Sequence, residues 1–179
     1  MRRNVYALCV ALACAFGGAA RAAQGTAVGD TIARFSVPGH DSAKLTTPVI
    51  YAFVGTTCPT TAKYLERLVA LEKELGKRVA FVYVYPNHND TPQAKQAFHA
   101  KNGLGGVLVD DQGAKIATLL GAQKTSEVVL VSRKGKIVYR GAIDDNKDPA
   151  QVKRRHLAIA VREHLAGKKV STAKTDVFA

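Results

Sequence analysis

Cysteine is scarce in this sequence. The 179 residues contain three, and two of them, Cys9 and Cys14, lie near the N-terminus. Residues 1–22 have a basic start, an apolar run and an Ala-x-Ala motif ending at Ala22, a combination typical of a secretory signal peptide. We therefore predict cleavage after Ala22 and a periplasmic or secreted protein. Lipidation at Cys14 is an alternative, although Ala11 stands where a leucine is usual.

The predicted mature chain keeps one cysteine, Cys58, so it cannot form an internal disulfide in a compartment where structural disulfides are common. A lone thiol there is either a buried core residue or a group kept for chemistry. The sequence also lacks a His-x-x-x-His pair and any Cys/His cluster, which argues against a zinc site. We predict no metal and no tightly bound cofactor.

Acidic residues are also few: 14 stand against 26 lysines and arginines, and the formal net charge is +12. The basic residues are scattered, without a stripe of alternating basic and aromatic residues, so we predict no nucleic-acid binding. We favour a solvated basic face, with contact to an anionic membrane surface as the alternative. We expect a monomer.

No internal repeat or low-complexity segment interrupts the chain. We divide it into the signal peptide at 1–22, one domain at 23–167 and an exposed C-terminal tail at 168–179. Strand and helix patterns alternate within the domain, which indicates an α/β fold with a central sheet. Apolar runs predict strands at 49–54, 79–85 and 106–109 and a hairpin of 127–131 with 136–140. Helical periodicity and caps predict helices at 59–75, 90–102 and 114–120, and a last helix from Asp148-Pro149 to Leu165.

Cys58 stands where the strand at 49–54 gives way to the first helix, and Pro59 follows it. Proline is favoured at the first position of a helix, so Cys58 is the predicted N-cap. Unpaired N–H groups and the positive end of the helix dipole would stabilise a thiolate there. The thiolate is the nucleophilic form, so this placement predicts a reactive cysteine.

Other polar groups have structural interpretations. His88, at the end of the strand 79–85, could act on Cys58, but we favour a loop residue that caps backbone groups with Asp90. Asp144 and Asp145, together with Arg140, are expected to shape the turn into the last helix, with Asp148 as its cap.

Short segments in a fixed order resemble those of a known family. They are Val28-Gly-Asp30, Cys58-Pro59 with Tyr64, 89–92, 109–113, 120–122, 125–127 and 139–146. The chain resembles the redoxins, an exported thioredoxin-like group related to the alkyl hydroperoxide reductase and thiol-specific antioxidant proteins. The resemblance covers residues 27–178. It implies a thioredoxin-like fold, with a central mixed β-sheet flanked by helices and an N-terminal extension.

The chain departs from the thioredoxin pattern at three places. Thr61 stands where thioredoxins have the second cysteine of Cys-x-x-Cys, so the cycle between two neighbouring thiols is excluded. Ser126 stands where the resemblance implies a cis-proline facing the active cysteine. A cis bond before serine would cost about 2.5–4 kcal/mol, so we predict a trans bond. The tail ends at Ala179 without the cysteine that many similar chains carry.

It departs from the peroxiredoxin pattern as well. That family has threonine or serine three residues before its cysteine and proline seven before it, and Gly55 and Tyr51 occupy those places here. The peroxide-positioning motif is therefore missing, which ranks peroxide reduction below thiol exchange.

We predict thiol–disulfide exchange, or thiol-dependent peroxide reduction, through the single nucleophile Cys58. Thr57, Pro59 and Thr61 would hold and polarise the thiolate. A facing wall of the cleft would be formed by Thr125, Ser126 and Glu127. The partner would be an external thiol reductant or a disulfide-bearing protein. The alternative is a redox-inactive thioredoxin-fold module that binds proteins.

Overall fold

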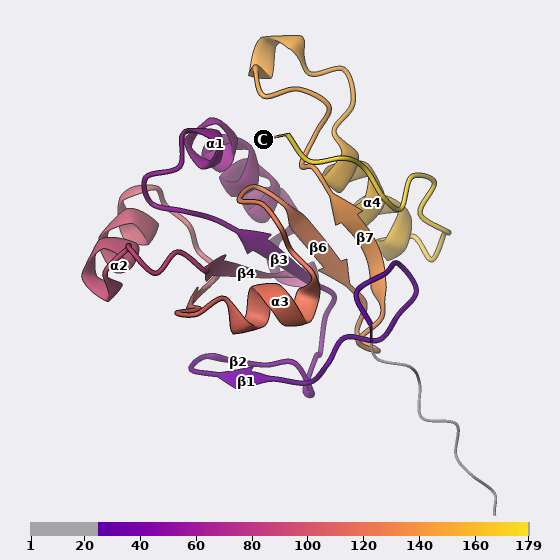
Figure 1. Cartoon of the computed structure of the whole chain (residues 1–179). Helices are drawn as coiled ribbons and strands as arrows, with labels where there is room; N and C mark the ends of the chain where they lie inside the picture. The colour runs from indigo at the N-terminus through magenta and orange to yellow at the C-terminus, as the bar shows by residue number, and fades with distance from the viewer. Residues whose placement is uncertain (1–24, 179) are drawn as a thin grey trace, which may run out of the picture.

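The computed structural model describes residues 25–178, and the predicted signal peptide, with Cys9 and Cys14, lies outside them. Helices and strands alternate through most of this range (Figure 1). The strands are β1 (Ser36–Val37), β2 (His40–Asp41), β3 (Val49–Phe53), β4 (Ala80–Tyr85), β5 (Val107–Asp110), β6 (Val128–Val131) and β7 (Ile137–Gly141). The helices are α1 (Pro59–Leu75), α2 (Pro92–Lys101), α3 (Lys115–Leu120) and α4 (His156–Leu165), with 3₁₀ turns η1 (Gly76–Arg78) and η2 (Pro149–Gln151).

The central sheet is mixed and has the strand order β5-β4-β3-β6-β7. Strands β3, β4 and β5 run parallel, whereas β6 lies antiparallel to β3 and β7 antiparallel to β6. All five residues of β3 are buried, because this central strand is covered on both faces. The predicted α/β fold with a central mixed sheet is confirmed, and Cys58 follows its middle strand.

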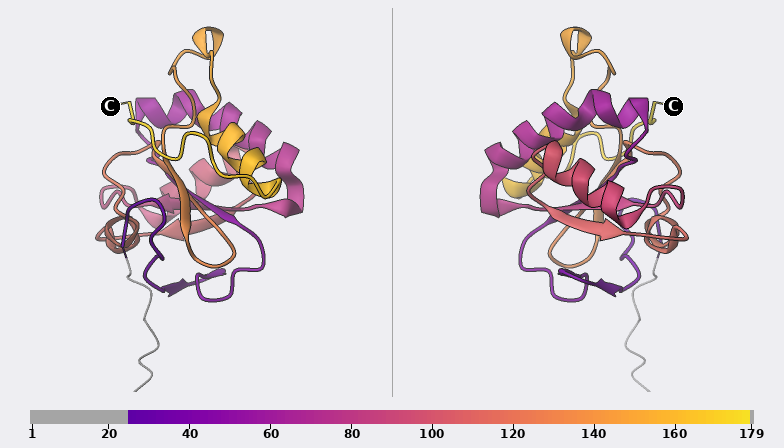
Figure 2. Two further views of the ribbon diagram at one scale, coloured as in Figure 1. Left: turned by 90° about the vertical axis from the view of Figure 1, so that its right-hand side faces the viewer. Right: turned by 90° about the vertical axis from the view of Figure 1, so that its left-hand side faces the viewer.

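Two hydrophobic clusters cover the two faces of the sheet. Ile50 and Ala52 of β3 join the cluster that contains residues of α1 and α4, whereas Tyr51 and Phe53 join the cluster that contains residues of α3. This alternation follows from the two-residue period of a strand. Figure 2 shows α1 and α4 together on one side of the sheet, with α3 and the β1–β2 hairpin on the other.

The last helix begins later than predicted. Asp148 accepts a hydrogen bond from the Ala150 N–H, but the turn that it caps is the short η2, and α4 starts at His156. The intervening chain is held by Asp145, whose carboxylate accepts from the Lys153 N–H and whose own N–H donates to the Arg154 carbonyl. The hydrogen bonds of Lys153 and Arg154 with Asp145 take the place of the helical hydrogen bonds that the Asp148-Pro149 start had predicted.

The C-terminal segment is less exposed than predicted. Val170 is buried, and Lys174 forms an isolated parallel bridge with Arg140 of β7. The Thr175 hydroxyl accepts from the Ala142 N–H at 2.9 Å and lies 2.9 Å from the Tyr139 hydroxyl. The segment therefore adds a short stretch of pairing along the edge strand β7, which otherwise would expose unpaired backbone groups.

We expect Thr175→Val to lower the free energy of unfolding by about 1–3 kcal/mol, because it leaves the buried N–H of Ala142 without its acceptor. Thr172→Val is the matched control, since the Thr172 hydroxyl contacts the exposed Arg154 side chain. Denaturant unfolding of both variants measures the difference. Equal stability would mean that the segment does not hold β7.

Candidate functional site

Cys58 is the N-cap of α1, as predicted. Its backbone is extended, with φ −78° and ψ 117°, and Pro59 occupies the first turn of the helix. The side chain is partly exposed, and Cys58 is the one free cysteine among residues 25–178. The sulfur forms no capping hydrogen bond with the first turn of α1. Its hydrogen-bond partner comes from another loop.

That partner is Thr125, in the loop between α3 and β6. The Cys58 Sγ lies 3.0 Å from the Thr125 Oγ1. Burial tends to raise the pKa of the Cys58 thiol, but the Thr125 hydroxyl and the nearby backbone and hydroxyl groups of Thr61, with the Thr60 N–H, outweigh it. The pKa of the Cys58 thiol is therefore lowered from its ordinary value. These groups therefore favour the thiolate form of Cys58, which accepts a hydrogen bond from the Thr125 hydroxyl.

Of the three residues predicted to support Cys58 from its own loop and helix, one is buried and two are exposed. Thr61 is 1 % exposed, and its Oγ1 accepts from the Gly55 N–H at 3.2 Å, so it also closes the loop before the cysteine. Thr57 and Pro59 are exposed. Neither forms a side-chain hydrogen bond with the sulfur in the described structure, and Pro59 acts through the start of α1.

Asp90 supports the same loop and was missed as a site residue. It is buried, and its Oδ2 accepts from the Thr56 N–H at 3.0 Å. The cap of α2 is instead Thr91, whose hydroxyl accepts from the Ala94 N–H. The Asp-Thr-Pro sequence indicated a helix start, but its spacing could not show that the aspartate faces the cysteine loop. His88, nearby in the sequence, is exposed.

Ser126 lies in the left-handed region, with φ 68°. No peptide bond of the described residues is cis, which confirms the prediction for the bond before Ser126. The Ser126 N–H donates to the Phe53 carbonyl at 2.6 Å and so joins this loop to the end of β3. Its buried hydroxyl has no hydrogen-bond partner in the described structure. A positive φ is rare for serine, and it stands directly after Thr125, the residue that contacts the sulfur.

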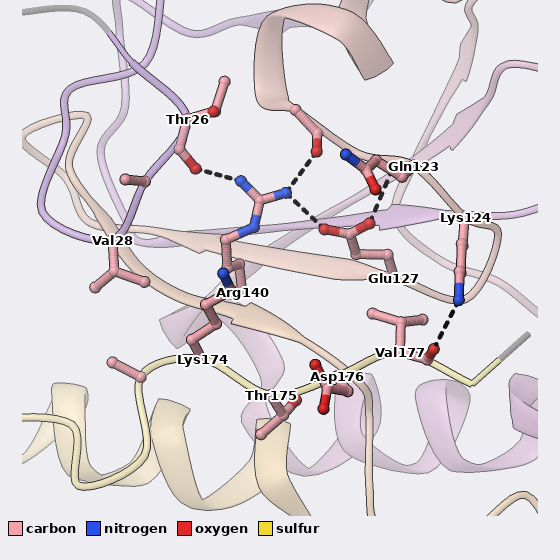
Figure 3. A pocket seen from close by; sticks show the side chains of 13 residues that line it. Thr26, Val28, Gln123, Lys124, Glu127, Arg140, Lys174, Thr175, Asp176 and Val177 are labelled. Atoms are coloured by element: carbon pink, nitrogen blue, oxygen red, sulfur yellow. Dashed lines mark hydrogen bonds and ion pairs between the residues drawn. The ribbon is translucent and has the colours of Figure 1, made fainter.

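The Glu127 carboxylate binds groups of its own loop and of β7. Its Oε1 accepts from Arg140 at 2.6 Å and its Oε2 accepts from the Gln123 N–H at 3.0 Å (Figure 3). Arg140 also donates to the carbonyls of Thr26 and Gly121. These contacts border a pocket of about 680 Å³ between the loop, β7 and the C-terminal segment. Glu127 therefore holds this loop in position, and among the described residues the Cys58 sulfur has Thr125, not Glu127, as its hydrogen-bond partner.

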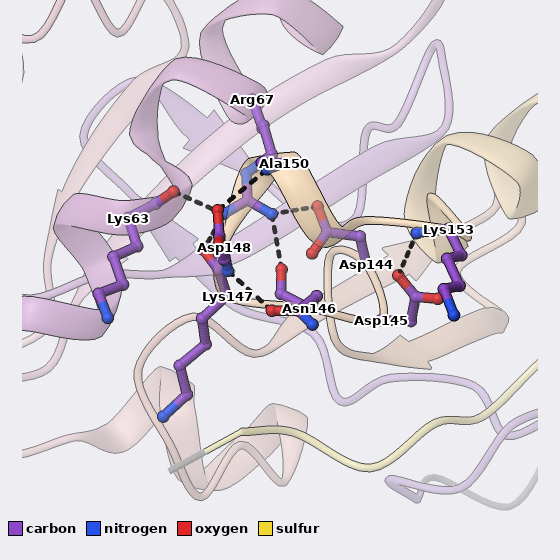
Figure 4. Close-up of polar contacts among 9 residues, drawn as sticks. All are labelled: Lys63, Arg67, Asp144, Asp145, Asn146, Lys147, Asp148, Ala150 and Lys153. Atoms are coloured by element: carbon purple, nitrogen blue, oxygen red, sulfur yellow. Dashed lines mark hydrogen bonds and ion pairs between the residues drawn. The ribbon is translucent and has the colours of Figure 1, made fainter.

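Arg67 of α1 holds the segment after β7. It donates to the buried Asp144 carboxylate at 2.5 Å and to the backbone carbonyls of Lys63, Asn146 and Lys147 (Figure 4). Asp144 thus pairs with Arg67 and not with Arg140. This arrangement confirms the structural interpretation of Asp144 and Asp145, since both shape the chain between β7 and α4.

The described residues contain no group of three or more His, Cys, Asp or Glu side chains placed to hold a metal ion. Nor do they include a helix of the length and apolarity that crossing a membrane requires.

Comparison with solved structures assigns the fold to the thioredoxin-like class. A hypothetical protein from Sinorhizobium meliloti has a TM-score of 0.75 at 24 % identity, covering 87 % of this chain and 93 % of its own. A Chlorobium tepidum protein described as a thiol:disulfide interchange protein of the DsbE type has a TM-score of 0.62 at 16 % identity, covering 80 % and 98 %. A secreted disulfide oxidoreductase of Mycobacterium tuberculosis has a TM-score of 0.50 at 20 % identity, covering 55 % and 72 %.

The family model of the redoxins matches residues 38–155, most of the chain. The chain therefore belongs to the Redoxin family, and the predicted resemblance is confirmed. No curated protein matches it.

We expect Thr125→Val to raise the pKa of the Cys58 thiol, because the thiolate loses its hydroxyl donor while the helix N–H groups remain. A higher pKa leaves less thiolate near neutral pH, so alkylation of Cys58 should slow roughly tenfold, as expected for loss of a hydrogen bond to a charged group. Thr57→Val is the matched control, since Thr57 is exposed. Equal rates for the two variants would contradict the assigned role of Thr125.

We expect Glu127→Gln to lower the free energy of unfolding by about 2–4 kcal/mol, because it breaks a pair whose two side chains are 7 % and 12 % exposed. Glu74→Gln is the control: its pair with Arg162 is about half exposed and should contribute less than about 1 kcal/mol. Denaturant unfolding measures both, and similar losses would show that the Glu127 pair does not hold the loop.

Proposed function

We propose that this redoxin is a thiol–disulfide oxidoreductase with one nucleophile, Cys58. The observation that carries the proposal is the partly exposed Cys58 sulfur 3.0 Å from the Thr125 hydroxyl, at the start of α1. A cysteine serving only the core would be buried in an apolar surrounding that raises its pKa. Burial also acts to raise the pKa of the Cys58 thiol, but the hydroxyl and N–H groups around it lower that pKa more. Membership of the Redoxin family supports the same interpretation of a reactive thiol.

In the first step, the Cys58 thiolate attacks one sulfur of a disulfide. The new bond joins Cys58 to that sulfur, and the old disulfide bond breaks to release the other sulfur as a thiolate. Thr125 donates to the Cys58 sulfur before the attack. Since the described residues hold no second cysteine, an external thiol must then attack the mixed disulfide. That step returns the Cys58 thiolate and leaves the external sulfur in a new disulfide.

Peroxide reduction is the second candidate, because a thiolate can also attack a peroxide oxygen. The products are a sulfenic acid on Cys58 and an alcohol or water, and two external thiols restore Cys58 while forming a disulfide and water. Gly55 bears on this candidate. A Cβ at Gly55 would lie 3.3 Å from the Cys58 Cβ and 3.5 Å from the Thr125 Cγ2. A hydroxyl residue of the peroxiredoxin type would therefore crowd the contact seen here, which favours disulfide exchange.

We also propose that the protein acts outside the cytoplasm, cleaved after Ala22. The signal-peptide pattern supports this location, as does the fold shared with a secreted disulfide oxidoreductase. The partner is an external thiol reductant or a disulfide-bearing protein.

The test is to incubate the folded mature protein with oxidised glutathione and follow its mass. We expect one glutathione adduct, absent from Cys58→Ser, that reduced glutathione removes. Thr125→Val should form the adduct more slowly than Thr57→Val at neutral pH, because less Cys58 is thiolate.

An adduct that forms only after unfolding would contradict the proposal and favour the redox-inactive binding module. Rapid sulfenic acid formation with hydrogen peroxide, without reaction with the disulfide, would favour the second candidate.

A further inference from the structure

A second pocket lies at the end of the sheet away from Cys58. It has a volume of about 570 Å³ and is bordered by the segment before β3, the end of η1, the β6–β7 turn and the end of α4. Pro48 precedes β3, whereas Cys58 follows it, and Val49 pairs with Val131 next to that turn. Figure 1 shows the β6–β7 turn and the start of α1 at opposite ends of the molecule.

This pocket is lined by three cationic side chains, one histidine and no carboxylate. The basic residues are Arg78, Arg133, Lys134 and His164. None of them belongs to an ion pair of the described structure, whose cations are Lys44, Arg67, Lys95, Arg140 and Arg162. Arg133 lies close enough to His164 to lower the pKa of that imidazole, after the larger effect of its burial. The positive charge of the pocket therefore comes from Arg78, Arg133 and Lys134, which have no counter-charge in its lining, whereas His164 adds little near neutral pH.

Such an arrangement fits a phosphate group. Repulsion among uncompensated cations destabilises the folded protein slightly, and an anion held among them would reverse this effect. Arg133 offers paired N–H donors, and Arg78, whose Nε donates to the Leu75 carbonyl, offers its terminal N–H groups. Lys134 and the hydroxyls of Thr46, Thr47 and Ser132 offer further donors to phosphate oxygens. The other large pocket differs, because its Arg140 is neutralised by Glu127.

We propose that this basic pocket docks the protein on anionic phospholipid, with the phosphate headgroups among Arg78, Arg133 and Lys134. The charges of Lys134 and Arg133 stand on an exposed turn, and the exposed Lys77 and Lys169 flank the pocket in the chain. Such a spread of cations suits a surface of many headgroups better than one small anion. Docking at this end leaves Cys58, at the other end of the sheet, facing away from the lipid.

The test is co-sedimentation of the mature protein with vesicles of phosphatidylcholine containing about one third phosphatidylglycerol, an anionic composition. The variant Arg133→Gln/Lys134→Gln removes two charges from exposed turn positions and keeps Gly135, which has a positive φ. Lys101→Gln/Lys115→Gln is the control, since it removes two exposed charges from residues that do not line the pocket. Thermal unfolding verifies that both variants fold.

We expect the wild type to bind these vesicles and not pure phosphatidylcholine. The pocket variant should bind roughly 10- to 30-fold more weakly, the effect of two basic side chains near an anionic surface, and the control should bind almost as well as wild type. Alkylation of Cys58 should proceed equally fast on vesicles and in solution. Vesicle binding itself does not depend on the proposed thiol chemistry, since it can be measured with Cys58→Ser.

Three outcomes would overturn the proposal. They are no binding to the anionic vesicles near physiological ionic strength, equal losses in the two variants, or protection of Cys58 on the vesicles. Binding of inorganic phosphate that the pocket variant loses, without vesicle binding, would identify a site for a soluble anion instead.

Discussion

The contact between the Cys58 sulfur and the Thr125 hydroxyl joins two loops that are distant in the sequence, and the surrounding structure holds those loops in place. Thr61 and Asp90 accept backbone N–H groups of the loop before Cys58. Ser126 joins the opposite loop to the end of β3. Each support is a buried polar group with a specific partner, and such groups are costly to leave unpaired. The site is thus fixed mainly by backbone hydrogen bonds.

The Glu127–Arg140 pair extends this support to the end of the chain. Arg140 lies on β7, where its backbone N–H and carbonyl also pair with the C-terminal segment. The loop that carries Thr125 is therefore connected through one side chain to the edge of the sheet and through it to residues 173–175. The C-terminal segment is thus a packed stretch that pairs with the edge strand β7.

Sequence patterns predicted the order of elements and the position of Cys58 because these depend on local periodicity and on the Cys-Pro helix start. The helix predicted at 59–75 matches α1 residue for residue. The predicted start of α4 was wrong because Asp145 binds backbone groups eight and nine residues ahead. No local sequence pattern reveals such a long-range contact. The roles of Asp90 and Glu127 were hidden for the same reason. Thr125 was predicted to face Cys58 through the family resemblance, whereas the contacts of Glu127 depend on a salt bridge to the neighbouring strand β7.

The most direct test of a poised thiolate is a pH titration of the Cys58 ¹³Cβ chemical shift in the folded mature protein, with Cys58→Ser to identify the signal. We expect a midpoint clearly below the value of about 8.5 for a free cysteine, because Thr125 and the start of α1 favour the thiolate. A midpoint at or above that value would contradict a poised thiolate and with it the proposed nucleophilic role of Cys58.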